Sequence, residues 1–147
     1  MHSGGFQILE HTADFGILAW GRTWKDLFEQ SAVGMLSQIV DPAKVRPLRT
    51  KTITFHGENP EELLLKGLKE ILFHIEKDGM IFSSVRLKPN VFSRGGRGRK
   101  RAKIVLRGER IDPQRHGICM EIKGVTRHGF FVEHEKSCWE TRILFDV

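Results

Sequence analysis

The hydrophobic pattern of this chain changes at Gly79. Two stretches before this residue repeat apolar side chains with the period of about 3.6 that is typical of helices, whereas the chain after it alternates with the period of about 2 that is typical of strands. Helices followed by crowded strands indicate the α+β class rather than alternating βαβ units. We therefore expect two helices packed on a mostly antiparallel mixed sheet of about seven strands, within a single domain over residues 1–147.

Each predicted helix begins with a capping signal. Thr23 is an N-cap with the carboxylate of Asp26 three residues later, and this helix should end before Pro42, which disfavours helical geometry at the residue that precedes it. Asn59 caps the second helix, which should stop at Gly79. Their apolar stripes predict core positions, namely Trp24, Leu27, Phe28, Met35 and Ile39, then Leu64, Leu68, Ile71, Leu72 and Ile75.

Strands are predicted wherever apolar and polar residues alternate. Two short strands flank the polar stretch 11–14, and the others are expected over residues 50–56, 81–87, 102–107, 118–125, 130–134 and 139–147. The strand predicted over residues 118–125 has two distinct faces, with Ile118, Met120 and Ile122 on one and Cys119, Glu121 and Lys123 on the other. A solvated strand face is one explanation of the charged pair on the second face.

His11 and Asp14 lie three residues apart in a polar connection between two apolar runs. Gly16 gives the backbone there a freedom that a side chain would remove. Such a connection can present the imidazole and the carboxylate toward one point, and these groups are common metal ligands. The same pattern also fits an Asx-turn closed by Asp14, so a structural and a metal-binding interpretation both stay open.

The net charge of +6 comes from one segment. Seven basic residues and no acidic residue lie between Arg94 and Arg107, and the rest of the chain carries a net charge of −1. We expect a basic Gly/Arg loop insertion over residues 93–101. It is either a solvated loop or a contact for RNA phosphates, and it has no interleaved aromatic residues for base stacking. The possible RNA contacts are Arg94, Arg97, Arg99, Lys100 and Arg101.

Composition argues against a membrane protein and against a secreted one. No apolar run approaches the roughly 20 residues of a membrane helix, and the first residues lack the apolar core of a signal peptide. Cys119 and Cys138 have no metal-type spacing, so we expect two reduced thiols in a cytoplasmic protein.

Asp146 lies on the apolar strand predicted for residues 139–147. A carboxylate in such a place needs a partner or a cation if it is buried, or it is simply exposed to solvent near the chain end. His116 and His128 flank the strand predicted over 118–125, and both are compatible with ordinary polar surface positions.

Four motifs follow one another along the chain. They are Glu10-His11-Thr12-Ala13-Asp14-Phe15-Gly16-Ile17, Gly108-Glu109-x-Ile111-Asp112-x-x-x-His116, Glu121-Ile122-Lys123-Gly124-Val125-Thr126-x-His128 and Ile143-Leu144-Phe145-Asp146-Val147. With these motifs in this order, the chain resembles the archease family from Phe6 to the C-terminus. Two positions differ from the family, which usually has an aromatic residue where Arg127 stands and alanine where Gly124 stands. The basic loop over residues 93–101 is not a family hallmark.

The resemblance implies an accessory protein rather than an enzyme. Archeases assist the RtcB-type RNA ligase in tRNA splicing and RNA repair, where they promote guanylylation of the ligase and its multiple turnover. The ligase, not the archease, uses GTP, and tRNA or other RNA is met indirectly through the ligase.

The family's site residues transfer to positions in this sequence. The resemblance implies that Asp14 and Asp146 bind a divalent metal, which would be Ca²⁺, Mg²⁺ or Mn²⁺, with His11 beside them. It also implicates Lys123, and we expect Lys123 and Glu121 to face phosphate or the ligase. Hard divalent cations prefer carboxylate oxygens, which agrees with these residue types.

Two other functions remain as alternatives. The chain could be a small RNA-binding module that acts through the segment Arg94 to Arg107, or a metal-dependent phosphoester hydrolase that uses His11, Asp14 and Asp146. The first alternative predicts tight RNA binding without a ligase, and the second predicts turnover by this chain alone.

Overall fold

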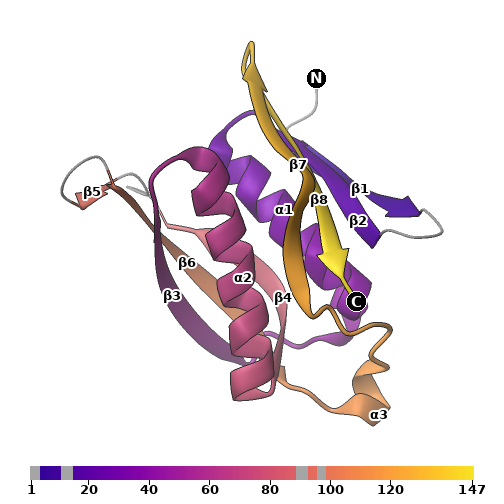
Figure 1. The fold of residues 1–147 in the computed structure, drawn as a ribbon. Coiled ribbons are helices and arrows are strands. Elements are labelled where there is room, and N and C mark those ends of the chain that lie inside the picture. The colour runs from indigo at the N-terminus through magenta and orange to yellow at the C-terminus, as the bar shows by residue number, and fades with distance from the viewer. Residues whose placement is uncertain (1–3, 11–14, 89–92, 96–98) are drawn as a thin grey trace.

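The computed structural model describes residues 4–10, 15–88, 93–95 and 99–147, and it contains two antiparallel sheets (Figure 1). The first sheet has the order β1-β2-β8-β7, with β1 (Gly4–Glu10), β2 (Phe15–Gly21), β8 (Cys138–Asp146) and β7 (Gly124–Glu135). The second has the order β3-β6-β4, with β3 (Arg49–Gly57), β6 (Arg99–Arg110) and β4 (Met80–Leu87), while short β5 (Ser93–Gly95) also pairs with β6.

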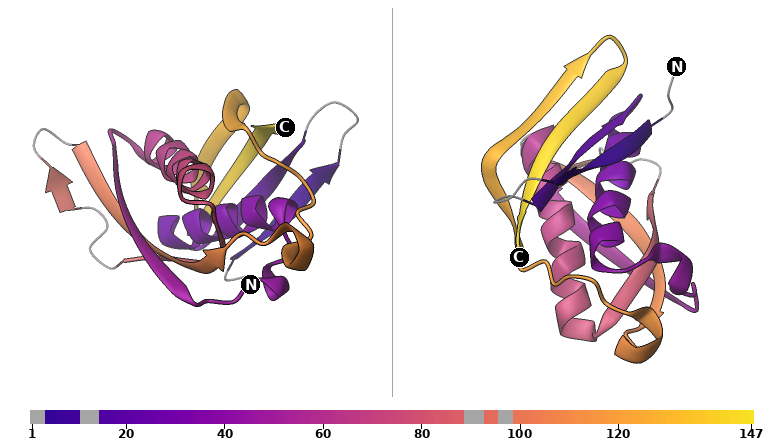
Figure 2. Two further views of the ribbon diagram at one scale, coloured as in Figure 1. Left: turned by 90° about the horizontal axis from the view of Figure 1, so that it is seen from below. Right: turned by 90° about the vertical axis from the view of Figure 1, so that its right-hand side faces the viewer.

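The two long helices lie between the sheets (Figure 2). Helix α1 (Trp24–Ile39) packs on β1 and β2 of the first sheet and on β4 of the second, and α2 (Pro60–Asp78) packs on β3 and β7. The predicted N-caps are confirmed, because Thr23 accepts from the N–H of Asp26 and Asn59 accepts from the N–H of Glu62. Gly79 ends α2 in the left-handed conformation, with φ of 64°.

Aromatic side chains fill the core where α1 meets α2 and β3. The ring of Phe28 stacks on Trp24 and on Phe55, with 5.5 Å between ring centroids in each case. Gly67 on α2 lets the helix backbone approach this stack, since an added Cβ would lie 2.6 Å from Cζ of Phe55. The buried core thus connects both helices to both sheets.

The α+β class and the two predicted helices are confirmed, but the strands are divided between two sheets. Helix α1 is buried around most of its circumference, because Ala32 and Leu36 are buried in addition to the predicted stripe. A helix that is apolar on several sides can be covered on several sides, and here a sheet lies on each.

Several predicted elements have other boundaries. The strand predicted over 118–125 is wrong, because residues 117–123 are irregular and β7 starts only at Gly124. The last residue of β8, Asp146, lies opposite Gly124, so β8 does not extend alongside residues 117–123. The stretch 130–134 belongs to the same long strand β7, which turns into β8 through Lys136 and Ser137, both with positive φ.

The helical turns α3 (Pro113–His116) and η1 (Pro42–Lys44) were not predicted. The expected loop over 93–101 differs from the structure at both ends, since 93–95 form β5 and 99–101 belong to β6, while 96–98 lie outside the described residues. In the part of the chain that is described, no helix has the length and apolar character needed to cross a membrane.

Candidate functional site

Asp146 lies at the end of β8, beside the start of β7. It pairs with Gly124, and the backbone N–H of Lys123 donates to the backbone O of Asp146 over 2.7 Å. The residue is exposed, and a Cβ added to Gly124 would lie 3.6 Å from Oδ2 of Asp146. The carboxylate is therefore accessible from solvent and lies beside Gly124, which has no side chain to cover it.

Strand β1 ends, and strand β2 starts, at the end of the sheet that carries Asp146. Glu10 pairs with Phe15, and Phe15 pairs in turn with Phe145, the residue before Asp146. The connection between Glu10 and Phe15 thus starts and finishes at the sheet end that carries Asp146. The predicted ligands His11 and Asp14 belong to this connection but lie outside the described residues, so their approach to Asp146 stays a prediction.

The chemistry of Asp146 fits a hard divalent cation. An exposed carboxylate offers oxygen ligands, and within the described ranges no basic side chain forms an ion pair with Asp146. The same ranges contain no group of three acidic, histidine or cysteine side chains able to hold a metal ion. The described residues therefore supply one carboxylate of the metal site that the sequence predicts.

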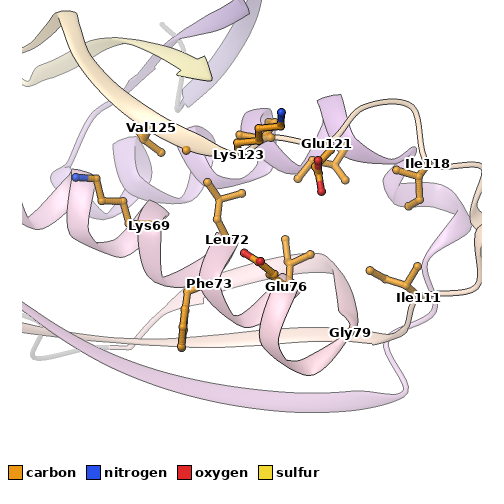
Figure 3. Close-up of a pocket in the computed structure, with 14 residues that line it drawn as sticks. Lys69, Leu72, Phe73, Glu76, Gly79, Ile111, Ile118, Glu121, Lys123 and Val125 are labelled. Atoms are coloured by element: carbon orange, nitrogen blue, oxygen red, sulfur yellow. The ribbon is translucent and has the colours of Figure 1, made fainter. Parts of the chain in front are cut away.

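A pocket of about 900 Å³ opens between α2 and the irregular segment 117–123 (Figure 3). The segment is fixed at both ends, because the N–H of Cys119 donates to the carbonyl of Ile39 and that of Lys123 to the carbonyl of Asp146. The pocket lining is mostly apolar, with Ile39, Leu72, Phe73, Ile75, Ile111, Ile118, Ile122 and Val125. Phe73 and Ile118 are exposed, so apolar surface faces solvent here.

Charged side chains ring this pocket. Glu76 on α2 and Glu121 on the segment direct their carboxylates into the opening, whereas the ammonium groups of Lys69 and Lys123 point away from it (Figure 3). The structure thus confirms that Glu121 and Lys123 are exposed, but on an irregular segment rather than on a strand. An apolar floor between carboxylates can accept an apolar segment that carries a positive charge.

The predicted RNA contacts lie on another part of the molecule. Arg94 belongs to β5. Arg99, Lys100 and Arg101 are the first three residues of β6, and they pair with β5. Strand β5 lies on the opposite side of the molecule from the C-terminus (Figure 1). Arg97 lies outside the described residues. The basic segment and the Asp146 site are therefore separate.

A buried polar cluster around Glu109 was not predicted. Its carboxylate accepts hydrogen bonds from the backbone N–H of Arg46 over 2.7 Å, from Nε2 of His116 over 3.0 Å and from the guanidinium of Arg115. The guanidinium of Arg115 and these two donors lower the pKa of Glu109 from its ordinary 4.5 to about 2, against the opposing effect of burial.

The ring of His116 has one defined tautomer. Its Nδ1 accepts from the backbone N–H of Asp112 over 2.9 Å, so the proton is on Nε2 and is donated to Glu109. The ring is fully buried and both nitrogens are used, which makes His116 a structural residue that fastens α3 to β6. The surface position considered for it is wrong. The sequence signal was Asp112 followed by Pro113, a cap and first helical residue.

Relatives of this chain match it over nearly their whole length. A model of the Archease protein family matches residues 6–147. Protein archease of Methanopyrus kandleri is 36% identical over 142 residues, which cover 97% of this chain and 99% of that protein. Protein archease of Methanosarcina acetivorans is 32% identical over 142 residues, which cover 97% and 95%.

Two solved structures have the same fold. Protein 1598 of Methanobacterium thermoautotrophicum superposes with a TM-score of 0.80 at 24% identity, over 97% of this chain and 99% of that one. An archease of Thermotoga maritima, described as a possible chaperone, superposes with a TM-score of 0.60 at 18% identity, over 96% of each chain. Together, the family model and the two sequence relatives show that this chain belongs to the archease family.

Proposed function

We propose that this chain is an accessory protein, not an enzyme, that activates an RtcB-type RNA ligase in tRNA splicing or RNA repair. The observation that supports this is the convergence of Asp146, Lys123 and the ends of β1 and β2 at one end of the first sheet, beside an apolar pocket. An exposed carboxylate, a nearby cation and apolar surface suit a site that docks on another protein.

In this proposal Asp146 holds a divalent ion together with Asp14 and His11. When bound, the ion supplies a positive centre for phosphate or carboxylate oxygens of the ligase. Asp146 is held in place through its backbone, because its carbonyl accepts from the N–H of Lys123. This bond couples the position of the carboxylate to the segment that carries Lys123 and Glu121.

The side chains of Lys123 and Glu121 then contact the ligase. Lys123 is exposed and points away from the pocket, so its ammonium group can reach phosphate or a carboxylate of the partner. Glu121 points into the pocket, where it can pair with a basic side chain that enters with an apolar segment. GTP is consumed by the ligase and not by this chain.

The test is RNA ligation by a purified RtcB-type ligase with GTP, divalent metal and excess RNA. Wild-type protein should carry the ligase past one turnover, whereas Asp146→Ala and Lys123→Ala should not. Glu135→Ala, which removes an exposed carboxylate at the distant β7–β8 turn, is the matched control and should act like wild type.

Three other results would separate the parts of the proposal. A ligase that responds equally to wild type and Asp146→Ala would remove Asp146 from the mechanism, and calorimetric titration with Ca²⁺ would show whether that variant still binds metal. A cognate ligase that does not respond to wild type contradicts the accessory role. Turnover of a phosphoester by this chain alone would favour the hydrolase instead.

A further inference from the structure

The second sheet has one covered face and one face open to solvent (Figure 2). Along β6, Ala102, Ile104 and Leu106 are buried against the helices, while Lys103 and Arg107 between and beyond them are exposed. This alternation is the ordinary pleat of a strand, whose successive side chains point to opposite faces. The exposed residues of β6 that alternate with Ala102, Ile104 and Leu106 therefore all lie on the open face.

Cations from two strands meet on that face. Arg86 on β4 pairs with Val105, and the N–H of Lys88 donates to the carbonyl of Lys103 over 2.9 Å, which places both beside β6. Directly paired residues of neighbouring strands point to the same side. The basic sheet face is defined by five exposed residues, namely Arg86, Lys88, Arg101, Lys103 and Arg107.

The rest of this face is rich in hydroxyl groups. Strand β3 places three threonines and a histidine opposite β6, and β4 adds a serine next to Arg107. These residues are Thr50, Thr52, Thr54, His56 and Ser84. None of the described residues of this face is an aspartate or a glutamate.

The five cations have no ion-pair partner among the described residues. The next carboxylate along β6 is that of Glu109, which is buried and already paired with Arg46 and Arg115. Its charge is therefore compensated from within the fold. The open face keeps a concentrated positive potential, because Arg101, Lys103 and Arg107 belong to the segment Arg94 to Arg107 that carries the excess charge of the chain, and Arg86 and Lys88 add to it.

We propose that the basic sheet face binds the phosphate backbone of RNA. Cations two residues apart on a strand are separated by about 6.8 Å, and neighbouring strands by about 4.8 Å, so the face offers a grid of charges to consecutive phosphates. Arginine, lysine, threonine and serine are among the side chains that contact phosphate oxygens. The proposal does not depend on the proposed ligase, and it uses residues outside the basic segment, such as Arg86 and Lys88.

The face favours RNA backbone over bases and over membranes. Its described residues include no phenylalanine, tyrosine or tryptophan, and His56 is half-buried, so little base stacking is expected and binding should tolerate many sequences. The exposed large apolar residues Phe15, Leu48, Phe73, Ile118 and Val147 all lie outside β3, β4 and β6, so the described residues of this face include no exposed large apolar side chain for insertion between lipids.

The experiment measures binding of a fluorescein-labelled single-stranded oligouridine to the full chain by fluorescence anisotropy at several salt concentrations. Wild type should bind with an affinity that falls steeply with salt, by a log–log slope of about −0.7 for each phosphate contacted. The variant Arg86→Glu/Lys103→Glu/Arg107→Glu should bind at least tenfold more weakly. The milder Arg86→Gln/Lys103→Gln/Arg107→Gln should flatten the salt slope even if the first variant folds poorly.

A control of equal charge change separates this face from net charge. Arg22→Glu/Lys66→Glu/Lys136→Glu alters three exposed cations elsewhere and should weaken binding less than twofold. Equal weakening by both triple variants would overturn the proposal, and so would absence of RNA binding at low salt. It would also be overturned if serine replacement of Arg94, Arg97 and Arg99 abolished binding while the face variants bound normally, or if the face variants lost binding to phosphatidylserine vesicles but not to RNA.

Discussion

The carboxylate of Glu109 and the imidazole of His116 are joined by a buried hydrogen bond of 3.0 Å between Oε2 and Nε2. Glu109 belongs to β6 and His116 ends α3. The same carboxylate accepts from the backbone N–H of Arg46, which follows η1. One side chain therefore ties a strand, a helical turn and a connecting segment together, close to where the irregular segment 117–123 begins.

Replacement of His116 by alanine should destabilise the protein. It removes the donor to Glu109 and leaves the backbone N–H of Asp112 without its acceptor. Unsatisfied buried polar groups cost about 1–3 kcal/mol each, so we expect a loss of that order in the free energy of unfolding, measured with urea. His128→Ala is the control, since His128 is exposed on β7, and it should change this free energy by less than about 0.5 kcal/mol. Equal losses would mean that His116 is not a structural residue.

Stability should depend on the charge of Glu109 below pH 4.5. The folded protein holds the pKa of this carboxyl at about 2, against an ordinary value of 4.5, chiefly through the guanidinium of Arg115. The charged form of the carboxyl is favoured in the folded state. The contribution of this carboxylate to the free energy of unfolding is therefore complete above pH 4.5 and is lost as the pH falls from 4.5 toward 2.

The measurement is urea unfolding of wild type and Glu109→Gln at pH 7 and pH 3. The variant should be clearly less stable at pH 7, and the difference should narrow at pH 3. The lowered pKa of Asp78, which accepts from His74 and Lys51, contributes equally to both proteins and cancels in this comparison. A difference that stays constant over this range would contradict the assignment.

Replacement of Gly67 by alanine should test the packing of α2. A Cβ there would collide with Cε1 of Phe28 and lie 2.6 Å from Cζ of Phe55, and overpacking of this kind costs about 1–3 kcal/mol. Alanine also gains about 1 kcal/mol of helix propensity over glycine, so the net loss should be up to about 2 kcal/mol. Lys66→Ala, one residue earlier and exposed, should be nearly neutral in the same unfolding assay. A variant more stable than wild type would show that the aromatic stack can move aside.

The helices could be predicted because their signals are local. Thr23, Asn59 and Gly79 act within one turn of the residue itself, and each cap has its predicted role. The stretch 118–125 has the alternation of a strand, but only Gly124 and Val125 pair with β8, and residues 118–123 have no neighbouring strand. A strand needs a partner, and the availability of a partner is a tertiary property that alternation does not encode.

The site could be predicted only in part. Asp146, Glu121 and Lys123 were identified through motifs, and the structure places Lys123 next to Asp146 through the backbone. The pocket beside them was not foreseen, since it forms between α2 and an irregular segment. The Glu109–His116 hydrogen bond could not be predicted either, because the two side chains meet only when α3 packs on β6.

The position of Gly124 offers a last test at the proposed metal site. An added Cβ would lie 3.6 Å from Oδ2 of Asp146, an ordinary contact, and the residue does not have positive φ. Gly124→Ala should therefore leave the free energy of unfolding unchanged or raise it by about 0.4–1 kcal/mol, through reduced entropy of the unfolded chain. Gly16→Ala in the same sheet is the contrast, because its Cβ would collide with the backbone O of Ile143 and lie 2.6 Å from Cδ2 of Leu144, at a cost of about 1–3 kcal/mol.

Calorimetric titration with Ca²⁺ completes this comparison. If Asp146 binds the ion on its open side, Gly124→Ala should keep the affinity of wild type within about threefold, which is less than 1 kcal/mol, whereas Asp146→Asn should lose most of it. Loss of binding in Gly124→Ala, with stability unchanged, would mean that the ion needs the space directly above the glycine. That result would place the proposed ion over Gly124 rather than on the outer side of the carboxylate.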